Sequence, residues 1–504
     1  MDNKIYYAAL ERANSYIDKY STNSKIINER FRPHYHLAAR IGWINDPNGF
    51  GYYNGRMHMF YQYNPYGSVW GPMHWGHAVS EDMVKWINRP VALAPSEPYD
   101  NDAGCFSGSS IVADGKFWLM YTGVGKDKYQ QQCLAYSTDG ENFQKYENNP
   151  VISAAQTPDG ASPFDFRDPY VYEHEGMFYC LIGTILGKYG NIAMFTSPDL
   201  KNWQFVGYAF DEGKSEYTSE GVCECPSRAL IDGKEVLFYS PQFMPYTGSK
   251  FRNIHSAAYV VGHFDYETGR FIGGPLHEID SGFDLYAPQV TKLPDGRTVM
   301  TAWMQMWDRN IPTAQDGWSG EMIFTRELTL KDGKLCQAPV REIEKYRTDE
   351  QTIDDIELCN SVVDVESFSG DCSEIIFTLH NGTANRAGIE LFKGPNHRTY
   401  LYYHAHSGRI TLDRVRSGID IRGKEGEEIY WQRSANAPAG ESITFRILLD
   451  NTSLEVFIEG TAETLTANIY ADETDTGVAF FADSGTARIC LLYTSDAADD
   501  RISV

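Results

Sequence analysis

Hydrophobic and polar residues alternate along most of the chain, and one pattern recurs five times between residues 50 and 303. Each copy has an alternating run, then an acidic residue or Asn followed by Gly, then a second run rich in aromatic residues. The five copies read FGYYNGRMHMFYQY, SIVADGKFWLMYTG, YVYEHEGMFYCLIG, ALIDGKEVLFYS and VTKLPDGRTVMTAW. Because Asn-Gly or Asp-Gly between two alternating runs is typical of a two-residue hairpin, each copy predicts a β-hairpin.

The spacing of the hairpins indicates the architecture. Their turn glycines are Gly55, Gly115, Gly176, Gly233 and Gly296, which are 60, 61, 57 and 63 residues apart. After the first three hairpins, the segments AVSEDMVKW, AYSTDGENF and FTSPDLKNW each add a strand, a Ser-x-Asp turn and a further strand. Four strands in each unit, repeated five times around an axis, predict a five-bladed β-propeller over residues 31–340.

The segments on either side of the propeller differ in pattern. Residues 1–30 carry charges throughout and predict an amphipathic helical extension, not a signal peptide or a membrane anchor. Residues 341–352 predict a charged, helical linker. Residues 353–504 contain short alternating strands separated by turns, which predict a β-sandwich. The fold class is therefore all-β, a five-bladed β-propeller followed by a C-terminal β-sandwich.

The end of the chain has an unusual sequence. The run CLLYTSDAADDRISV resembles a translated sequencing adapter more than the end of a protein. We therefore expect the tail from about Cys490 to be an assembly artefact, and sequencing of the genomic locus tests this expectation.

Composition excludes several classes of partner. The chain has 504 residues, a net charge of −24 and no run of Lys or Arg, which argues against nucleic acid, because phosphate contacts need clustered cations. An odd number of scattered cysteines, nine in all, predicts reduced thiols and a cytoplasmic location. We expect no membrane partner, and the oligomeric state cannot be read from the sequence.

Three carboxylates occupy equivalent places in the repeat. Asp46 and Glu224 each lie nine residues before a turn glycine, and Asp168 lies eight residues before one. Equivalent positions in a propeller point toward the same end of the central channel, so the three side chains are expected to converge. The other two blades have Phe106-Ser107 and Tyr286-Ala287 at this place.

Clustered carboxylates indicate a specific chemistry. Without matching cations they raise one another's pKa, which separates a protonated acid from an ionised nucleophile, as glycoside hydrolysis requires. A Ca²⁺ site is the alternative, although Ca²⁺ ligands usually come from one short loop. Arg167 is expected to donate hydrogen bonds to a carboxylate or to a sugar hydroxyl. The other candidates around the cluster are Trp43, Gln62, Trp70, Trp75, His77 and Trp303.

Several short motifs carry a family resemblance. NDPNG, FRDP and ECP, in this order, resemble the signature motifs of glycoside hydrolase family 32, the invertases and fructan hydrolases. YQYNP, WGHA, FSGS and YAPQ are similar to family sequences in the intervals between them. The resemblance covers nearly the whole chain and implies the same propeller and sandwich.

The resemblance also implies roles for individual residues. Asp46 is expected to be the nucleophile, Glu224 the general acid and base, and Asp168 the residue that holds fructose hydroxyls and stabilises the transition state. The positions expected to contact the fructosyl unit are Asn45, Gln62, Trp70, Phe106, Ser107, Arg167 and Trp303. No cofactor or metal is expected.

The implied activity is that of a retaining β-fructofuranosidase, of the invertase or sucrose-6-phosphate hydrolase type. Retention predicts that the nucleophile and the acid/base carboxyls lie about 5 to 5.5 Å apart. The alternatives are an inverting five-bladed arabinan or xylan hydrolase and a non-catalytic fructan-binding protein. Sucrose, sucrose 6-phosphate and short fructo-oligosaccharides all remain possible substrates, with Lys250, Arg252 and His255 as candidate phosphate contacts.

Overall fold

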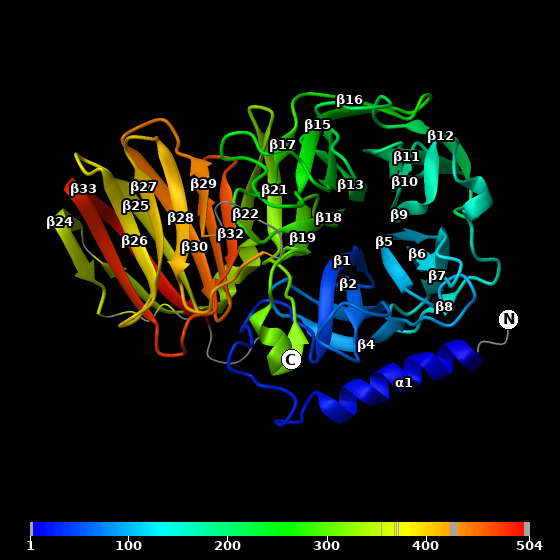
Figure 1. Cartoon of the computed structure of the whole chain (residues 1–504), viewed down its shortest axis with the longest axis horizontal. Coiled ribbons are helices and arrows are strands. Elements are labelled where there is room, and N and C mark those ends of the chain that lie inside the picture. Colours follow the sequence, from blue (N-terminus) through cyan, green and yellow to red (C-terminus); the bar gives the residue numbers. More distant parts are fainter. Residues whose placement is uncertain are drawn as a thin grey trace.

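The protein consists of an N-terminal helix, a five-bladed β-propeller and a C-terminal β-sandwich (Figure 1). This computed structural model describes residues 4–353, 355–366, 368, 370, 372–423 and 431–497. The expected fold class is confirmed. No helix in this part of the chain is long and apolar enough to cross a membrane.

Helix α1 (Lys4–Tyr20) lies along the first blade. Tyr6, Ala9, Ala13 and Ile17 are buried, at the three- and four-residue intervals that place side chains on one face of a helix. The Tyr6 hydroxyl donates to the Ala92 carbonyl oxygen at 2.8 Å. The extension is therefore packed onto the propeller through one apolar face.

The four main strands of each blade pair antiparallel in sequence order, and β20 adds a short parallel pairing to the first blade. The first blade has β1 (Gly42–Tyr53), β2 (Arg56–Asn64), β3 (His74–Ser80) and β4 (Ile87–Leu93), with β20 (Trp318–Ser319) beside β1. The second has β5 (Gly104–Ala113), β6 (Lys116–Val124), β7 (Gln130–Ser137) and β8 (Gln144–Lys145). The third has β9 (Ala161–His174), β10 (Met177–Leu186), β11 (Tyr189–Ser197) and β12 (Gln204–Tyr208), preceded by the 3₁₀ helix η1 (Ala154–Gln156).

The fourth and fifth blades complete the ring. The fourth has β13 (Cys223–Ile231), β14 (Lys234–Pro241), β15 (Ala258–Asp265), β16 (Arg270–Gly273) and β17 (His277–Glu278). The fifth has β18 (Tyr286–Lys292), β19 (Thr298–Trp303), β21 (Arg326–Lys331) and β22 (Lys334–Pro339), with the 3₁₀ helix η2 (Pro312–Asp316) in the β19–β21 connection.

The hairpin turns follow the sequence signal. At Asn54-Gly55 both residues have positive φ, 47° and 82°, as a type I′ turn requires, and Asp114-Gly115 repeats this with 51° and 69°. The fifth turn differs, because it is longer and closes through a hydrogen bond from the Leu293 amide to the Arg297 carbonyl oxygen.

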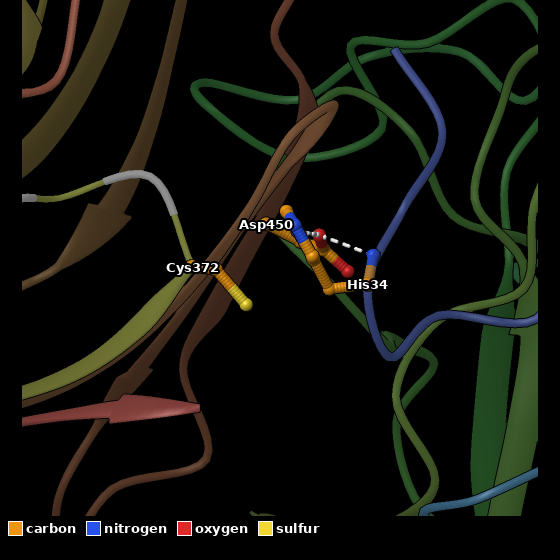
Figure 2. A group of neighbouring side chains, drawn as sticks. All are labelled: His34, Cys372 and Asp450. Carbon is orange, nitrogen blue, oxygen red and sulfur yellow. Dashed lines mark hydrogen bonds and ion pairs between the residues drawn. The ribbon is translucent and has the colours of Figure 1, made fainter. Parts of the chain in front are cut away.

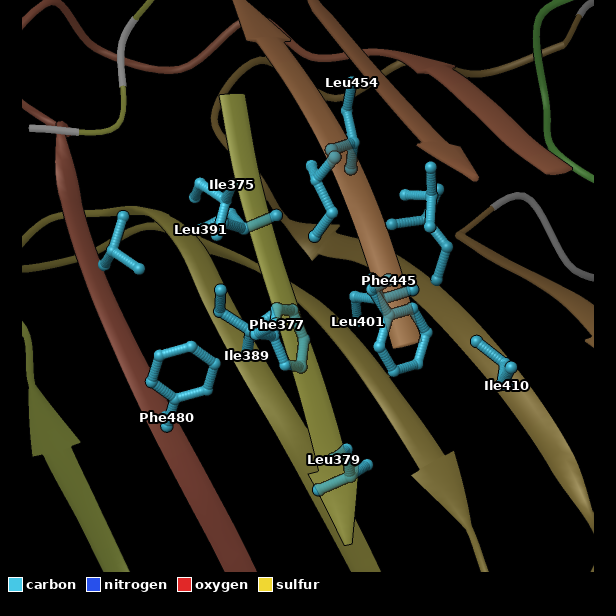
Figure 3. Close-up of a cluster of buried hydrophobic side chains, with 14 of the residues drawn as sticks. Ile375, Phe377, Leu379, Ile389, Leu391, Leu401, Ile410, Phe445, Leu454 and Phe480 are labelled. Atoms are coloured by element: carbon cyan, nitrogen blue, oxygen red, sulfur yellow. The ribbon is translucent and has the colours of Figure 1, made fainter. Parts of the chain in front are cut away.

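The sandwich follows a short 3₁₀ helix, η3 (Arg341–Tyr346). Its strands are β23 (Arg347–Ile353), β24 (Ile356–Asp364), β25 (Ser373–His380), β26 (Arg386–Lys393), β27 (Arg398–His404), β28 (Arg409–Arg416), β29 (Gln432–Asn436), β30 (Ser442–Asp450), β31 (Ser453–Ile458), β32 (Thr464–Asn468) and β33 (Gly477–Ala497). Aliphatic and aromatic side chains from several of these strands fill the space between the layers (Figure 3).

The suspected tail falls partly within β33. Residues up to Ala497 pair with β23 and β25, with Tyr493 opposite Thr352 and Ile376, and residues 498–504 lie outside the described part of the chain. The adapter hypothesis stays a prediction, because a strand of foreign sequence can pair through its backbone as a native one does.

Candidate active site

The innermost strands of all five blades have a β-bulge, which lies near the first residues of four of them and in the middle of β9. The register shifts affect β1 between Ile44 and Pro47, β5 between Phe106 and Gly108, β9 between Arg167 and Tyr170, β13 between Glu224 and Ser227, and β18 between Tyr286 and Gln289. In four strands the bulge contains an X-Pro pair: Asp46-Pro47, Asp168-Pro169, Cys225-Pro226 and Ala287-Pro288. Proline has no amide hydrogen for the ladder, so the pairing is interrupted there. Each bulge turns a side chain toward the channel.

Asp46 is buried and hydrogen-bonded to the neighbouring blade. The Ser107 hydroxyl donates to its Oδ2 at 2.7 Å, while its Oδ1 has no hydrogen-bond partner among the described residues. Burial and the nearby charge of Glu224 raise the pKa of Asp46, although the hydrogen bonds from Ser107 and Asn45 oppose the shift. One oxygen is therefore held in place and the other is available to a ligand.

Asp168 is held by backbone groups in a left-handed conformation, with φ of 65°. The Cys225 amide donates to its Oδ2 at 3.0 Å, and the Asp168 amide donates to the Thr122 hydroxyl at 3.0 Å. The Cys225 sulfur lies 3.6 Å from Asp168 Oδ2 and 3.7 Å from Asp46 Oδ2, so these two carboxylates converge on one atom. Burial, with the charges of Glu224 and Asp46, raises the pKa of Asp168 to about 7 despite the opposing Arg167 charge.

Glu224 has the most polar surroundings of the three. Arg167 donates from Nε and Nη2 to its Oε1 at 3.0 and 2.8 Å, and the Tyr286 hydroxyl donates to its Oε2 at 2.5 Å. Burial would raise its pKa, but the Arg167 charge and the Tyr286 hydrogen bond outweigh burial, so the pKa of Glu224 lies below its usual value. Arg167 was expected to donate to a carboxylate or to a sugar hydroxyl, and in the structure it donates to the Glu224 carboxylate.

This charge distribution corrects one expectation. The cluster does have a matching cation, Arg167, and that cation selects Glu224 as the ionised member in the ligand-free protein. Asp168, whose pKa is raised to about 7, is the member that retains a proton near neutral pH, and the pKa of Asp46 is raised as well. The same cation argues against the Ca²⁺ alternative, because its positive charge beside Glu224 would repel a second cation bound there.

The expected fructosyl contacts differ in burial and in their partners. Asn45 is buried and accepts a hydrogen bond from the Trp43 indole, and Trp303 is buried against Trp43. Ser107 reaches Asp46 directly. Gln62 is buried and donates to the Cys105 carbonyl oxygen.

Two further contact candidates lie at the edge of the site. Trp70 is 45% exposed and packs edge-on against Phe106. Trp75 and His77, by contrast, lie within the blades, where Trp75 donates to the Phe106 carbonyl oxygen and His77 contacts His58.

The candidate phosphate contacts do not form one cationic group. Lys250 is paired with Glu463 of the sandwich at 2.7 Å, and Arg252 donates to the Gly248 carbonyl oxygen within its own loop. Only His255 is close to the triad, with its ring 5.9 Å from that of Tyr286.

Tyr286, Cys225 and Trp307 are site residues to which the sequence gives no role. Tyr286 occupies the register position of the carboxylates, and its hydrogen bond to Glu224 shows its contribution. Cys225 is one of the nine scattered cysteines, and its amide and sulfur both contact the triad. Trp307 packs against Trp43 and Trp303, and no sequence pattern indicated it.

Two groups of side chains among the described residues could hold a metal ion, and neither includes a triad carboxylate. They are His34, Cys372 and Asp450, and His397, Asp472 and Asp475. In the first group the N-terminal segment meets the sandwich (Figure 2). Asp450 accepts a hydrogen bond from the His34 amide at 2.7 Å and contacts its ring nitrogen at 3.1 Å. These contacts join two parts of the fold, and we assign the group to that structural role.

Comparison with known proteins gives consistent matches over this architecture. Residues 36–339 match the model of the glycosyl hydrolases family 32 N-terminal domain, and residues 342–495 match that of the family 32 C terminal. The chain is 36% identical to a sucrose-6-phosphate hydrolase of Zymomonas mobilis, over 86% of this chain and 85% of that protein. It is 35% identical to a raffinose invertase of Escherichia coli, over 90% and 93%. A β-fructofuranosidase structure from Bombyx mori has a TM-score of 0.83 and 30% identity, covering 99% of both chains.

Proposed function

Because the chain belongs to family 32 of the glycosyl hydrolases, we propose that it releases terminal β-D-fructofuranosyl units from sucrose and short fructo-oligosaccharides with retention of configuration. The observation that carries the proposal is the convergence of Asp46, Asp168 and Glu224 on equivalent bulges of three blades. The family membership and the paired carboxylates do not favour the inverting and non-catalytic alternatives.

In the first step Asp46 attacks the anomeric carbon of fructose while Glu224 protonates the glycosidic oxygen. The bond to the leaving sugar breaks, and a covalent fructosyl-enzyme forms. In the second step Glu224 removes a proton from water, the water oxygen attacks the anomeric carbon, and Asp46 is released. Asp168 binds fructose hydroxyls throughout and stabilises positive charge on the ring.

A proton must move from Asp168 to Glu224 before this reaction can begin. Substrate hydroxyls that donate to Asp46 and Asp168 favour the ionised forms of both carboxylates. The proton retained by Asp168 then passes to Glu224, whose two neighbours, Arg167 and Tyr286, also stabilise the charge that returns after each protonation. The three groups therefore titrate as one unit.

The identity of the leaving sugar is part of this proposal. Curated relatives are named for hydrolysis of sucrose 6-phosphate and for cleavage of raffinose. The pairing of Lys250 with Glu463 leaves no preformed group of cations at the suggested phosphate position, which favours neutral sugars there. We also infer a cytoplasmic location, since the nine cysteines are odd in number and scattered along the sequence without paired spacing.

The test is the stereochemistry of the first product. Purified protein is mixed with sucrose in D₂O, and proton NMR follows the anomers of the released fructose. We expect β-D-fructofuranose to appear first, and Asp46→Asn to reduce kcat by at least about 1,000-fold, as loss of a nucleophile does. Asp159→Asn, an exposed surface change, is the control. Initial release of the α anomer, or full activity of Asp46→Asn, would contradict the proposal.

A further inference from the structure

Exposed aromatic side chains gather at the end of the propeller that carries the triad. The inner strand of each blade begins at this end, so in the antiparallel sheet the second strand ends there and the loop to the third strand lies there. These loops, together with the first residues of β9, carry Trp70, Tyr129, Phe164, Phe243 and Tyr246, each between 37% and 61% exposed. The rim of the site therefore offers flat apolar faces to solvent.

Two of these residues, from different blades, form a preassembled surface. Tyr129 precedes β7 of the second blade, and Phe164 belongs to β9 of the third. Their rings are stacked, with centroids 5.2 Å apart and planes inclined by 29°. Tyr129 is 37% exposed and Phe164 is 50% exposed. We refer to these two residues as the rim pair.

The rim pair is connected to the acid/base residue through a short chain of contacts. Gln130, next to Tyr129, accepts hydrogen bonds from the Phe166 amide at 2.7 Å and from Arg167 Nη1 at 3.3 Å. Arg167 in turn donates to Glu224 at 2.8 Å. The rim pair is thus fixed to the side of the site where Glu224 meets the glycosidic oxygen, and the leaving sugar lies beyond that oxygen.

We propose that the rim pair is a binding subsite for the leaving-group sugar, a hexose whose pyranose ring stacks on the two aromatic rings. The inference rests on the proposed function, which places Glu224 at the glycosidic oxygen. A pyranose has one face of C–H groups that packs well against an aromatic ring, and its hydroxyls stay solvated at an open rim. Because the rings are already stacked on each other, little side-chain freedom is lost when the sugar binds.

The charges beside the rim pair are mostly balanced. Lys128, next to Tyr129, is paired with Asp102, and Asp165, next to Phe164, is paired with Arg167 at 3.3 Å. The pair therefore contributes its apolar faces, and the contact is with the ring of the sugar.

The test compares two substrates that differ only in the leaving group. Sucrose carries a hexose ring there, and methyl β-D-fructofuranoside carries a methyl group. We expect Phe164→Ala and Tyr129→Ala each to lower kcat/KM for sucrose about five- to tenfold, with less than about a twofold change for the methyl fructoside. Tyr129→Phe keeps the stacking and should retain the wild-type ratio of the two values. Phe164→Leu removes the aromatic face at similar volume and covers the case in which the Ala variant does not fold.

The control is Tyr52→Ala, which removes a residue 38% exposed near the turn at the opposite end of the first blade. It should leave the values for both substrates unchanged. Equal losses on both substrates, or no loss on sucrose, would overturn the subsite. A wild-type protein that cleaves neither substrate would instead overturn the proposed function, so the two failures are distinguishable.

Discussion

Asp168 is a carboxyl group whose environment disfavours its charge. It is 5% exposed and adjacent to two other carboxylates, and within the described part of the chain its carboxylate accepts a hydrogen bond from the Cys225 amide and contacts the sulfur of the same residue. Its pKa of about 7, against an ordinary value of 3.8, means that the folded state binds its proton more tightly than the unfolded state does. Asp168, which we propose stabilises the transition state, therefore lowers the free energy of unfolding of the free enzyme.

Asp168→Asn tests this cost through its pH dependence. Below about pH 3 the wild-type carboxyl is protonated in both states, so the variant and the wild type should have similar Tm. As pH rises from about 3 to 7 the unfolded state loses its proton first, and the wild type loses stability relative to the variant. We expect Asp168→Asn to raise Tm at pH 8 and not at about pH 3, measured by scanning calorimetry. Activity should be lost at both pH values.

The matched control, Asp139→Asn, is expected to shift Tm in the opposite direction. Asp139, in a Ser-x-Asp turn, accepts hydrogen bonds from the Ser137 hydroxyl and from the amides of Glu141 and Asn142, which hold its pKa below its usual range. Asp139→Asn should therefore lower Tm at pH 8. An equal shift of Tm at both pH values for Asp168→Asn would contradict the raised pKa.

At this scale the sequence predicted which residues meet but not which of them is charged. The register of Asp46, Asp168 and Glu224 follows from counting along the repeat. The order of their pKa values depends on the direction of the Arg167 side chain, which points to Glu224 and not to Asp168. Such a choice depends on packing in three dimensions, and no spacing along the chain records it.

At the scale of the element, the β-bulge places the functional side chains. A regular strand would direct alternate residues up and down the blade, whereas a bulge adds one unpaired residue and turns its side chain. The second blade builds its bulge differently from the other four, because Gly108 takes the place of proline after Ser107. A Cβ at Gly108 would overlap with the Met120 carbonyl oxygen of the adjoining strand.

Gly108→Ala should therefore disturb the bulge and the site together. The added methyl group must push β5 away from β6, which we expect to cost about 1–3 kcal/mol in the free energy of unfolding. The Ser107 hydroxyl then moves from Asp46, and kcat should fall about tenfold or more. Urea denaturation and sucrose hydrolysis measure the two effects.

Gly274→Ala is the control for this change. Gly274 lies in the fourth blade, and a Cβ there meets only the Val261 carbonyl oxygen at 3.7 Å, an ordinary contact. Its stability and activity should match the wild type. A Gly108→Ala variant with wild-type stability and activity would show that the bulge does not position Ser107.

The hairpins were predictable and the bulges were not, for a physical reason. A type I′ turn needs positive φ at two adjacent residues, and Asn54-Gly55 satisfies this need locally. A bulge depends on the neighbouring strand, and its only sequence trace is the proline that follows Asp46, Asp168, Cys225 and Ala287. These prolines are visible in the sequence motifs, but an X-Pro pair is equally typical of a turn.

At the scale of the whole molecule, a buried ion network joins the propeller to the sandwich. The two ring nitrogens of His36, which precedes the first blade, contact Asp450 at 2.9 Å and Glu455 at 2.8 Å. Glu455 also accepts a hydrogen bond from Arg326 of the fifth blade at 3.0 Å. The network therefore ties the start and the end of the propeller to β30 and β31. The sequence predicted both domains but not this junction, because His36 and Arg326 each lie more than 100 residues from the carboxylates that they contact.

The stability that His36 provides should depend on pH. Burial alone would lower its pKa, but the hydrogen bonds and charges of Asp450 and Glu455 raise it to about 10, above the ordinary value of 6.5. A group with a raised folded-state pKa gives its full stabilisation below pH 6.5 and loses it as pH rises toward 10. The carboxylates have lowered pKa values and contribute only above about pH 4 to 5, so the network is strongest between pH 5 and 6.5.

His36→Gln removes the charge that these carboxylates need. Breaking a buried ion pair leaves an uncompensated charge, so we expect the variant to lose about 3 kcal/mol or more in the free energy of unfolding at pH 6. At pH 9.5 the wild type has lost part of the same stabilisation, and the difference should shrink. Scanning calorimetry at both pH values measures it, with His406→Gln, an exposed residue of the sandwich, as the control. A loss that is equal at both pH values would mean that His36 acts through packing and hydrogen bonds alone, without its charge.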